Sequence, residues 1–421
     1  MNEDPADGIR HRVAQMYERH PYPPVDDDIA AYKRGDAWLL ESPNPSFHLY
    51  WPHRSYTEDL DILVAGCGTQ QAAQIAAGLP GARIVATDIS DNSLNETQRL
   101  ADKAGIGNLT LEKLPVEASS MLGRDFDLVV CTGVLHHLAD PARGLKALAD
   151  VLRPSGSMHL MLYGRHGRTG VYMMQDLLRM IGIDPDEVTV RQIGKIRDLI
   201  EALPPTHPFG AVRDLHPDWR DDEGLVDLLL HVQDQAYTLT EADDLLGGAG
   251  LKMQKLLFPG RTDPMFTPLG DVAAKGFGAL PDIEQRAAVE LYRASVKKHV
   301  FIACHRARPA TDYEISPRQK NWAHVLPEIT YGIEVERPGP ARKTYRMIWP
   351  YYGEPGIAVE TTENGIKLLE AFDGDRTVAE AVKAAGLRKN DKALMRQLEG
   401  FLERCARAGF LTFRSRVTSS G

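Results

Sequence analysis

The feature that most constrains this chain is an apolar run that ends in two glycines. Residues 61–65 read Asp-Ile-Leu-Val-Ala, and Gly66-Cys67-Gly68 follows before a helical pattern over residues 71–79. Because glycine has no Cβ, such a turn lets bare backbone and a helix N-terminus approach a ligand closely. The stretch predicts either a nucleotide-binding turn or an ordinary tight turn after a buried strand.

A second strand pattern, residues 82–88, ends in Asp88, about twenty residues past the glycines, where dinucleotide-binding folds hold the ribose hydroxyls. Their fingerprint also requires a third glycine at position 71, where this chain has Gln71. The sequence therefore favours a ribose-binding Asp88 and argues against a nicotinamide cofactor. The alternative interpretation makes Asp88 the N-cap of a helix over residues 90–103.

A further strand pattern, residues 126–131, precedes the stretch Thr132-Gly133-Val134-Leu135-His136-His137-Leu138 and then Asp140-Pro141. Together with the glycine turn and Asp88, this stretch resembles the class I S-adenosylmethionine-dependent methyltransferases. The resemblance is close over residues 61–162 and looser over residues 17–306. It implies a Rossmann-like α/β core whose seven-stranded sheet has an antiparallel last strand, S-adenosyl-L-methionine as cofactor, and methyl transfer as activity.

The resemblance also assigns cofactor contacts by position. The glycine turn would hold the methionine part, the end of the second strand the ribose, the turn after the third strand the adenine, and the turn after the fourth strand the region near the sulfonium. These positions are Gly66, Cys67, Gly68, Asp88, Ile89, Leu114, Pro115, Val116, Thr132 and Gly133. Val64 and Pro115 replace residues that are often acidic in the family, and Gln70 replaces a glycine. Adenine recognition is therefore expected to rely on backbone and apolar contacts.

The segment before the core is predicted to cover it. Residues 9–19 have helical spacing, and the proline-rich stretch 20–24 cannot continue that helix. Residues 17–24 are similar to the Tyr-x-x-x-Pro-Tyr-Pro segment that precedes some methyltransferase cores. Tyr17 or Tyr22 is expected to touch the cofactor or to exclude water from the reacting methyl. The alternative is a strap that only packs on the core.

The catalytic candidates are His137, His231 and Tyr237. The last two belong to a long insertion at about residues 165–237, and insertions at the carboxyl ends of strands carry substrate specificity in α/β enzymes. On a helix over residues 225–233, Asp227 and His231 would share one face, where an acid and a proton acceptor can meet. The plainer alternatives are a solvated polar face and, for His137, a residue of the cavity wall.

Composition narrows the class of protein. The net charge of −9 argues against a broad phosphate-binding surface, so nucleic acid is retained only as a partner of the C-terminal domain. Four scattered cysteines have no metal-like spacing, and neither a disulfide framework nor a metal site is expected. No apolar run approaches the roughly twenty residues of a membrane span, and no signal peptide is recognised. No membrane contact and a cytoplasmic location are expected.

With 421 residues the chain is long enough for two or three domains. We expect a cap at residues 1–56, the core at 57–308 with insertions at about 165–237 and 259–297, and an accessory domain at 309–421. From about residue 363 the order helix, helix, longer helix, strand is winged-helix-like, and it is also similar to peptide-carrier domains found beside peptide-modifying enzymes. A homodimer is one arrangement considered.

The predicted function is methyl transfer from S-adenosyl-L-methionine to an unidentified acceptor. A protein or peptide is favoured slightly over a small molecule, because a small metabolite would not need the accessory domain. The alternatives are an RNA methyltransferase, a nucleotide-sugar or nicotinamide enzyme that uses the same glycine turn, and a non-catalytic protein that binds the cofactor as a sensor or scaffold.

Overall fold

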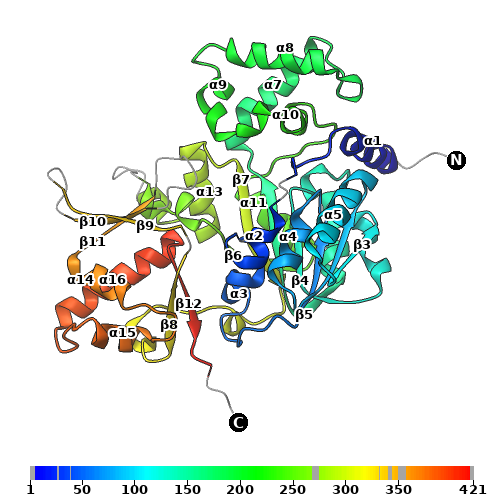
Figure 1. Ribbon diagram of the computed structural model, residues 1–421. Helices are drawn as coiled ribbons and strands as arrows, with labels where there is room; N and C mark the ends of the chain where they lie inside the picture. Colours follow the sequence, from blue (N-terminus) through cyan, green and yellow to red (C-terminus); the bar gives the residue numbers. More distant parts are fainter. Residues whose placement is uncertain are drawn as a thin grey trace. The chain divides into compact units, whose positions relative to one another are not determined.

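A computed structural model describes residues 5–25, 28–37, 39–267, 275–330, 332–339, 344–348 and 357–417 (Figure 1). The chain divides into two compact units. The first combines residues 1–46, 57–255 and 293–308, and the second combines residues 47–56, 256–292 and 309–421. Residues 1–46 therefore share a unit with the core. The domain limits drawn from the sequence stay a prediction.

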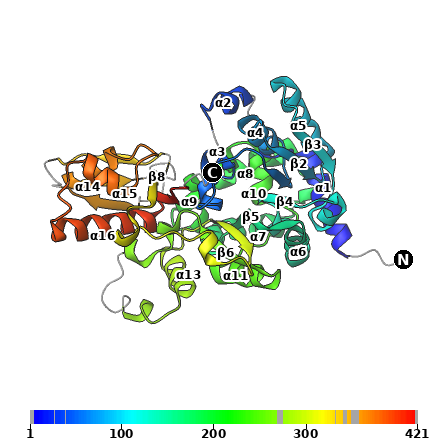
Figure 2. The same cartoon turned by 90° about the horizontal axis from the view of Figure 1, so that it is seen from below.

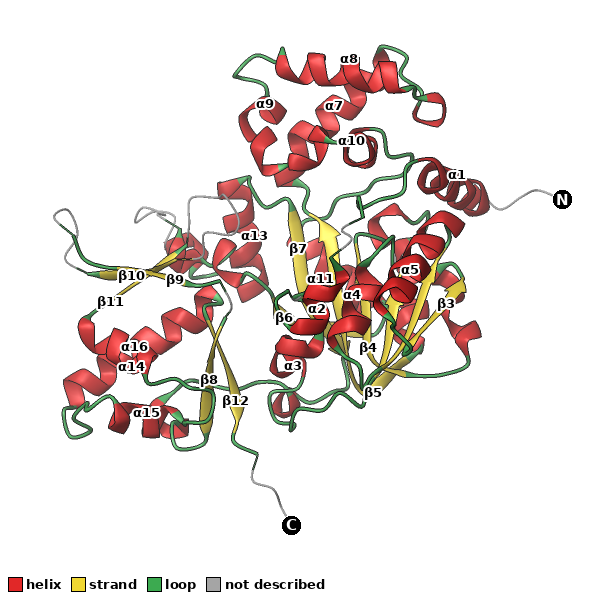
Figure 3. Ribbon diagram, viewed as in Figure 1, coloured by secondary structure: helices red, strands yellow, loops and turns green. Residues whose placement is uncertain are grey.

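The first unit is built on a seven-stranded sheet with the strand order β3-β2-β1-β4-β5-β7-β6 (Figure 3). Strand β1 pairs in parallel with β2 and β4, whereas β7 pairs antiparallel with β5, which confirms the predicted α/β core with an antiparallel last strand. All five residues of β1 are buried, because helices cover both faces of the sheet. The strands are β1 (Asp61–Ala65), β2 (Arg83–Asp88), β3 (Leu109–Lys113), β4 (Phe126–Thr132), β5 (Leu152–Tyr163), β6 (Leu251–Leu256) and β7 (Lys298–His305).

Helices cover both faces of the sheet (Figure 2). Helices α4 (Gln71–Gly78) and α5 (Asp91–Ala104) lie on one face, and α6 (Pro141–Asp150) and α11 (Leu239–Gly248) lie on the other. Local capping explains where two of them begin. Ser90 caps α5 by accepting a hydrogen bond from the backbone N–H of Ser93, so the alternative that made Asp88 the N-cap is wrong. Thr238 and Glu241 form a capping box at the start of α11.

The segments before β1 and after β5 are mainly helical. The N-terminal segment contains α1 (Pro5–Arg19), α2 (Ile29–Arg34) and α3 (Pro43–Tyr50), and the insertion contains α7 (Thr169–Met180), α8 (Val190–Glu201), α9 (Pro208–Val212) and α10 (Asp222–Leu229). The insertion has an apolar core of its own, in which residues such as Met174, Ile196 and Leu225 are buried together with Met16 of α1. Helix α1 is thereby fixed against the insertion.

The second unit has a separate core around helix α16, which contributes Leu398, Phe401 and Leu402. Strands β9 to β11 form an antiparallel sheet, and β12 pairs antiparallel with β8. Helices α14 to α16 and strand β12 lie where three helices and a terminal strand were expected, while the winged-helix assignment stays a prediction. The elements are β8 (Val325–Ile329), β9 (Glu334–Glu336), β10 (Tyr345–Ile348), β11 (Ala358–Thr361), β12 (Leu411–Ser415), α13 (Asp282–Arg293), α14 (Glu363–Glu370), α15 (Val378–Ala384) and α16 (Lys392–Ala408). Among the described residues, no helix is long and apolar enough to span a membrane.

Asp61, the first residue of β1, is the centre of an ion-pair network. Its carboxylate accepts hydrogen bonds from Arg83 at 2.8 Å, from Arg153 at 2.7 Å and from Arg124. The hydrogen bond from Arg83 is the largest of the effects that hold the pKa of Asp61 well below its usual range, against the opposing effect of burial. Because the pKa of Asp61 is lower in the folded state, its ionisation stabilises the fold at pH values above the unfolded-state pKa of about 4. This contribution is lost as the pH falls from that value through the lower folded-state pKa.

We therefore expect Asp61→Asn to lower the free energy of unfolding at neutral pH by about 1–3 kcal/mol, because the buried side chain of residue 61 loses the charge that pairs with three more exposed arginines. Urea unfolding should also show that the stability of the variant changes less than that of the parent between about pH 5 and about pH 2. Asp59→Asn is the matched control, since Asp59 pairs with Arg83 but is 77% exposed. An equal loss in both variants would contradict the prediction.

Candidate functional site

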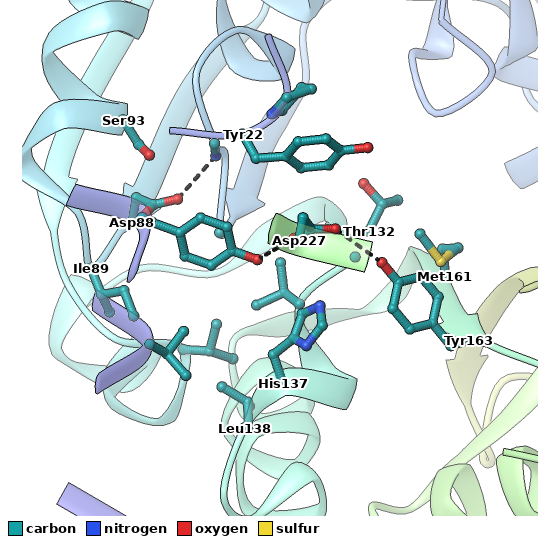
Figure 4. Close-up of a pocket in the computed structure, with 18 of the residues that line it drawn as sticks. Tyr22, Asp88, Ile89, Ser93, Thr132, His137, Leu138, Met161, Tyr163 and Asp227 are labelled. Carbon is teal, nitrogen blue, oxygen red and sulfur yellow. Dashed lines mark hydrogen bonds between the residues drawn. The ribbon is translucent and has the colours of Figure 1, made fainter. Parts of the chain in front are cut away.

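A cavity of about 380 Å³ lies at the carboxyl ends of the central strands, within the first unit (Figure 4). Its volume is within the range of small-molecule sites, roughly 300–1,000 Å³. Strand β1 lies between β2 and β4. The chain continues from β1 to β2 on one side and later crosses from β3 to β4 on the other side, and open α/β sheets bind ligands at such a switch point. The lining includes Tyr17, Tyr22, Gly66, Cys67, Gly68, Asp88, Ile89, Leu114, Val116, Thr132, Gly133, His137, Met161, Tyr163 and Asp227.

The glycine turn after β1 has a backbone that only glycine adopts easily. Gly66 has φ +69° and Gly68 has φ +56°, both in the left-handed region. A Cβ on Gly66 would lie 2.4 Å from a methyl carbon of Val134, and a Cβ on Gly68 would lie 3.1 Å from the carbonyl oxygen of Tyr22. Glycine is therefore required at both positions by the backbone conformation and by the close approach of Val134 and Tyr22. The turn lines the cavity without a side chain, and this fits a cofactor held close to the backbone.

Asp88 ends β2 beside this turn. Its two carboxylate oxygens accept the backbone N–H groups of Gly68 and Ser90, each at 2.9 Å. Burial raises the pKa of Asp88, and the hydrogen bonds from Ser90 and Gly68 oppose that rise. A carboxylate offers about four lone-pair sites, so Asp88 can accept a ligand hydroxyl in addition to these backbone groups. Ile89, Leu114 and Val116 add an apolar wall, whereas Pro115 is outside the described lining of the cavity.

The N-terminal strap crosses the glycine turn. The hydroxyl of Thr69 donates to the carbonyl of Pro23 at 2.6 Å. Tyr22 lines the cavity, and its hydroxyl donates to Asp218 at 2.9 Å. Tyr17 lines the same cavity from helix α1. Both tyrosines singled out in the sequence therefore lie at the cavity, and their contact with the cofactor stays a prediction.

A second group of polar residues, the Asp227 cluster, consists of Tyr17, His137, Asp227 and His231. The Tyr17 hydroxyl donates to Asp227 Oδ1 at 3.0 Å and lies 3.2 Å from His231 Nε2. The rings of His137 and His231 are stacked, with centroids 3.6 Å apart. Helix α10 ends at Leu229, so the expectation that Asp227 and His231 share a helical face is wrong. The two side chains meet through Tyr17 instead.

Burial sets the protonation of the Asp227 cluster. It raises the pKa of Asp227 to about 7, against the opposing hydrogen bond from Tyr17. It lowers the pKa of His137, and it lowers that of His231 well below the usual range. At neutral pH both imidazoles are therefore uncharged, while the carboxyl group can gain or lose a proton. Groups of this kind can accept a proton from a bound substrate.

Two further tyrosines, the candidate Tyr237 and the unpredicted Tyr163, have different positions. Tyr237 is buried outside the described lining of the cavity; its backbone N–H donates to the carbonyl of Tyr163, and its own carbonyl accepts from His299. Tyr163 was not predicted, yet it lines the cavity, and its hydroxyl lies 3.5 Å from Asp227 Oδ2 (Figure 4). Tyr163 is the last residue of β5, so the rule that sites lie at the carboxyl ends of parallel strands could have identified it.

Comparisons with known proteins agree on the class. Residues 63–158 match a family described as methyltransferase domain. The chain is 25% identical to syc1184_c, an uncharacterized protein of Synechococcus sp., over 93% of this chain and 92% of that protein. The ubiquinone biosynthesis O-methyltransferase of Parvibaculum lavamentivorans is 33% identical, and the match covers 26% of this chain and 42% of that enzyme. PKMT2 from Rickettsia typhi in complex with AdoHcy has a similar fold, with a TM-score of 0.64 and 17% identity over 94% of this chain and 77% of that one.

The sheet order, the glycine turn, Asp88 and these matches define the class. The core of this chain is a class I S-adenosylmethionine-dependent methyltransferase domain, and S-adenosyl-L-methionine is its cofactor. The chain spans less than half the length of the ubiquinone methyltransferase it matches, so the activity and the acceptor of the whole protein are proposals.

Gly68→Ala should weaken cofactor binding. The variant places a Cβ in the left-handed region, which costs about 1–2 kcal/mol, and brings it against the backbone of Tyr22. Calorimetry with S-adenosylhomocysteine should show a loss of affinity of about tenfold, together with a lower free energy of unfolding. Gly107→Ala is the control, because a Cβ there meets no atom within 4 Å. Unchanged affinity in Gly68→Ala would show that the turn does not approach the cofactor.

Proposed function

We propose that the chain transfers a methyl group from S-adenosyl-L-methionine to an acceptor that loses a proton in the reaction. The observation that carries this proposal is one cavity with two chemically different ends. At one end lie the Gly66–Gly68 turn and Asp88, which suit the cofactor, and at the other lies the Asp227 cluster, which suits an acceptor. The bound cofactor supplies an electrophilic methyl group, and the protein has to align, enclose and deprotonate its acceptor.

For the cofactor, we propose ribose contacts from Asp88, methionine contacts from the Gly66–Gly68 turn and Thr132-Gly133, and apolar contacts to adenine from Ile89, Leu114 and Val116. The hydroxyl of Thr132 accepts a hydrogen bond from Gln71 at 2.8 Å, which orients it at the cavity. His137 lines the acceptor end, whereas His231 supports it from behind. Tyr237 is proposed only as a support of β5, because its backbone pairs with Tyr163.

The acceptor is proposed to be a protein or peptide side chain rather than a small molecule. The second unit supports this proposal, since it has its own apolar core and can present a docking surface. A small-molecule acceptor and an RNA acceptor are the alternatives, and relatives are named for both: ubiquinone biosynthesis and a tRNA uridine derivative. The net charge of −9 weighs against RNA. A cytoplasmic location forms part of the same proposal.

Asp88→Ala should bind both S-adenosylmethionine and S-adenosylhomocysteine at least about tenfold more weakly than the parent, because a hydrogen bond to a charged group contributes roughly 1.5–3 kcal/mol. Calorimetric titration measures this, with NAD as the ligand control. Asp91→Ala is the matched variant, since Asp91 is exposed on α5 and pairs with Lys113. Binding of NAD, or equal effects of the two substitutions, would contradict the cofactor assignment.

Transfer of a labelled methyl group identifies the acceptor. The parent enzyme is incubated with labelled S-adenosylmethionine and, separately, with a peptide digest, a metabolite fraction and total RNA from one cell extract. Incorporation into the peptide digest is expected. Incorporation only into metabolites or RNA would keep the methyltransferase and replace the acceptor, whereas binding without incorporation into any fraction would favour a cofactor-sensing protein.

A further inference from the structure

The backbone of one residue, Gln233, determines the directions of the hydrogen bonds in the Asp227 cluster. The carbonyl oxygen of Gln233 lies 2.7 Å from His137 Nδ1, and a carbonyl only accepts, so His137 Nδ1 carries a hydrogen. The backbone N–H of Gln233 donates to His231 Nδ1 at 3.1 Å, so that nitrogen carries none. Because both imidazoles are neutral, His137 has its lone pair on Nε2 and His231 has its hydrogen on Nε2.

These tautomers orient the rest of the cluster. His231 Nε2–H donates to the hydroxyl oxygen of Tyr17 across 3.2 Å. The hydrogen of that hydroxyl is then directed at Asp227 Oδ1, 3.0 Å away. Asp227 Oδ2 receives a longer bond of 3.5 Å from Tyr163. Each donor in the series points toward the Asp227 carboxylate, and hydrogen bonds to an ionised carboxylate favour that ionised form.

The same residues raise the question of a cation, since donor atoms of His137, Asp227 and His231 lie within 4.8 Å of one another. A histidine binds a metal ion through a nitrogen without hydrogen. In His231 that nitrogen is Nδ1, which is already bonded to the N–H of Gln233. If the hydrogen of His231 moved to Nδ1 to free Nε2 for a metal ion, Nδ1–H and the N–H of Gln233 would point at each other. The hydrogen-bond directions therefore favour proton transfer over metal binding.

We infer that Asp227 is the proton acceptor of the methyl-transfer step, and that His231 and Tyr17 are positioning residues that direct hydrogen bonds at its carboxylate. This inference rests on the proposed function. In the step, the N–H or O–H bond of the acceptor breaks and its proton goes to the Asp227 carboxylate. The electron pair left on the acceptor forms the bond to the methyl carbon, while the pair of the broken S–CH₃ bond stays on sulfur. The substrate class is an ammonium or hydroxyl group, not a carboxylate, which has no proton to lose.

The surroundings of Asp227 allow it to take up a proton near neutral pH. The ionised form is favoured by the hydrogen bond from Tyr17 and by the charge of Arg168, and it is disfavoured by burial and by the charges of Asp218 and Asp234. Arg168 is paired with Asp234 at 2.8 Å, which divides its effect between two carboxylates. The ionisable groups that surround Asp227 are Tyr17 from α1, Tyr22 from the strap after α1, His137 after β4, Tyr163 and Arg168 at and after β5, Asp218 before α10, and His231 and Asp234 after α10.

The first test titrates Asp227 in the full chain by infrared difference spectroscopy, with and without S-adenosylhomocysteine. The parent should show a protonated-carboxyl band that disappears as the pH rises through about 7 and that Asp227→Asn lacks. Tyr17→Phe should move the midpoint upward by about one pH unit, because it removes a hydrogen bond that favours the ionised form. His231→Phe should move it in the same direction. Tyr172→Phe is the matched control, because its hydroxyl bonds Asp234 at 3.3 Å and its side chain is outside the described lining.

The second test measures incorporation of labelled methyl into the peptide, metabolite and RNA fractions as a function of pH. Asp227→Asn should lose about 10²- to 10⁴-fold in rate with unchanged affinity for S-adenosylhomocysteine, and Tyr17→Phe should move the acidic limb of the rate profile upward. An unmoved Asp227 midpoint in Tyr17→Phe, or a full rate in Asp227→Asn, would overturn the inference. Zn²⁺ binding to the parent that disappears in Asp227→Asn, together with Zn²⁺-dependent incorporation, would replace it by a cation site. If the parent binds no S-adenosylhomocysteine, the proposed function is wrong. This outcome is distinct from failure of the inference, because the carboxyl band of Asp227 is measured without ligand as well.

Discussion

The site depends on the parallel pairing of β1 with β2 on one side and with β4 on the other. In this register Val64 lies opposite both Ala86 and Val130, so the three strands end together at one edge of the sheet. Gly66, Asp88 and Thr132 follow at those ends. If one strand were shifted by a residue, its buried side chains would turn to the other face, and the close packing of this apolar sheet makes such a shift costly. The cofactor end of the cavity is therefore a direct consequence of the sheet.

The acceptor end has a different origin. Tyr17 and Asp227 are separated by 210 residues and are brought together by α1 and the helical insertion. These helices share an apolar core that includes Met16, the neighbour of Tyr17. Burying an isolated carboxyl group is costly, and the hydrogen bonds from Tyr17 and Tyr163 offset part of that cost. A buried carboxyl group that lowers the stability of the fold is typical of a functional site.

The second unit follows the same physical rules with a separate core. Asp263 is fully buried there and forms two hydrogen bonds with Arg407, at 2.6 and 2.8 Å, which keeps a buried charge paired. Thr377 and Glu380 begin α15 with a capping box. An apolar core of this kind gives the unit a folded surface of its own.

Local patterns in the sequence were sufficient for the core and for much of the cavity lining at the ends of the strands. Strands, the glycine turn, the capping residues and Asp88 are specified by neighbouring residues, and parallel strands must place their ends at one edge. The acceptor end was predicted only in part. His231 was identified on the assumption of a helix that in fact ends at Leu229, Tyr163 was overlooked, and Tyr237 lies outside the cavity. Sequence alone determined which segments form the sheet and its turns, because those depend on local periodicity and backbone freedom. Only the tertiary structure decided which side chains meet at Asp227, because that depends on how α1 and the insertion pack across long separations in the chain.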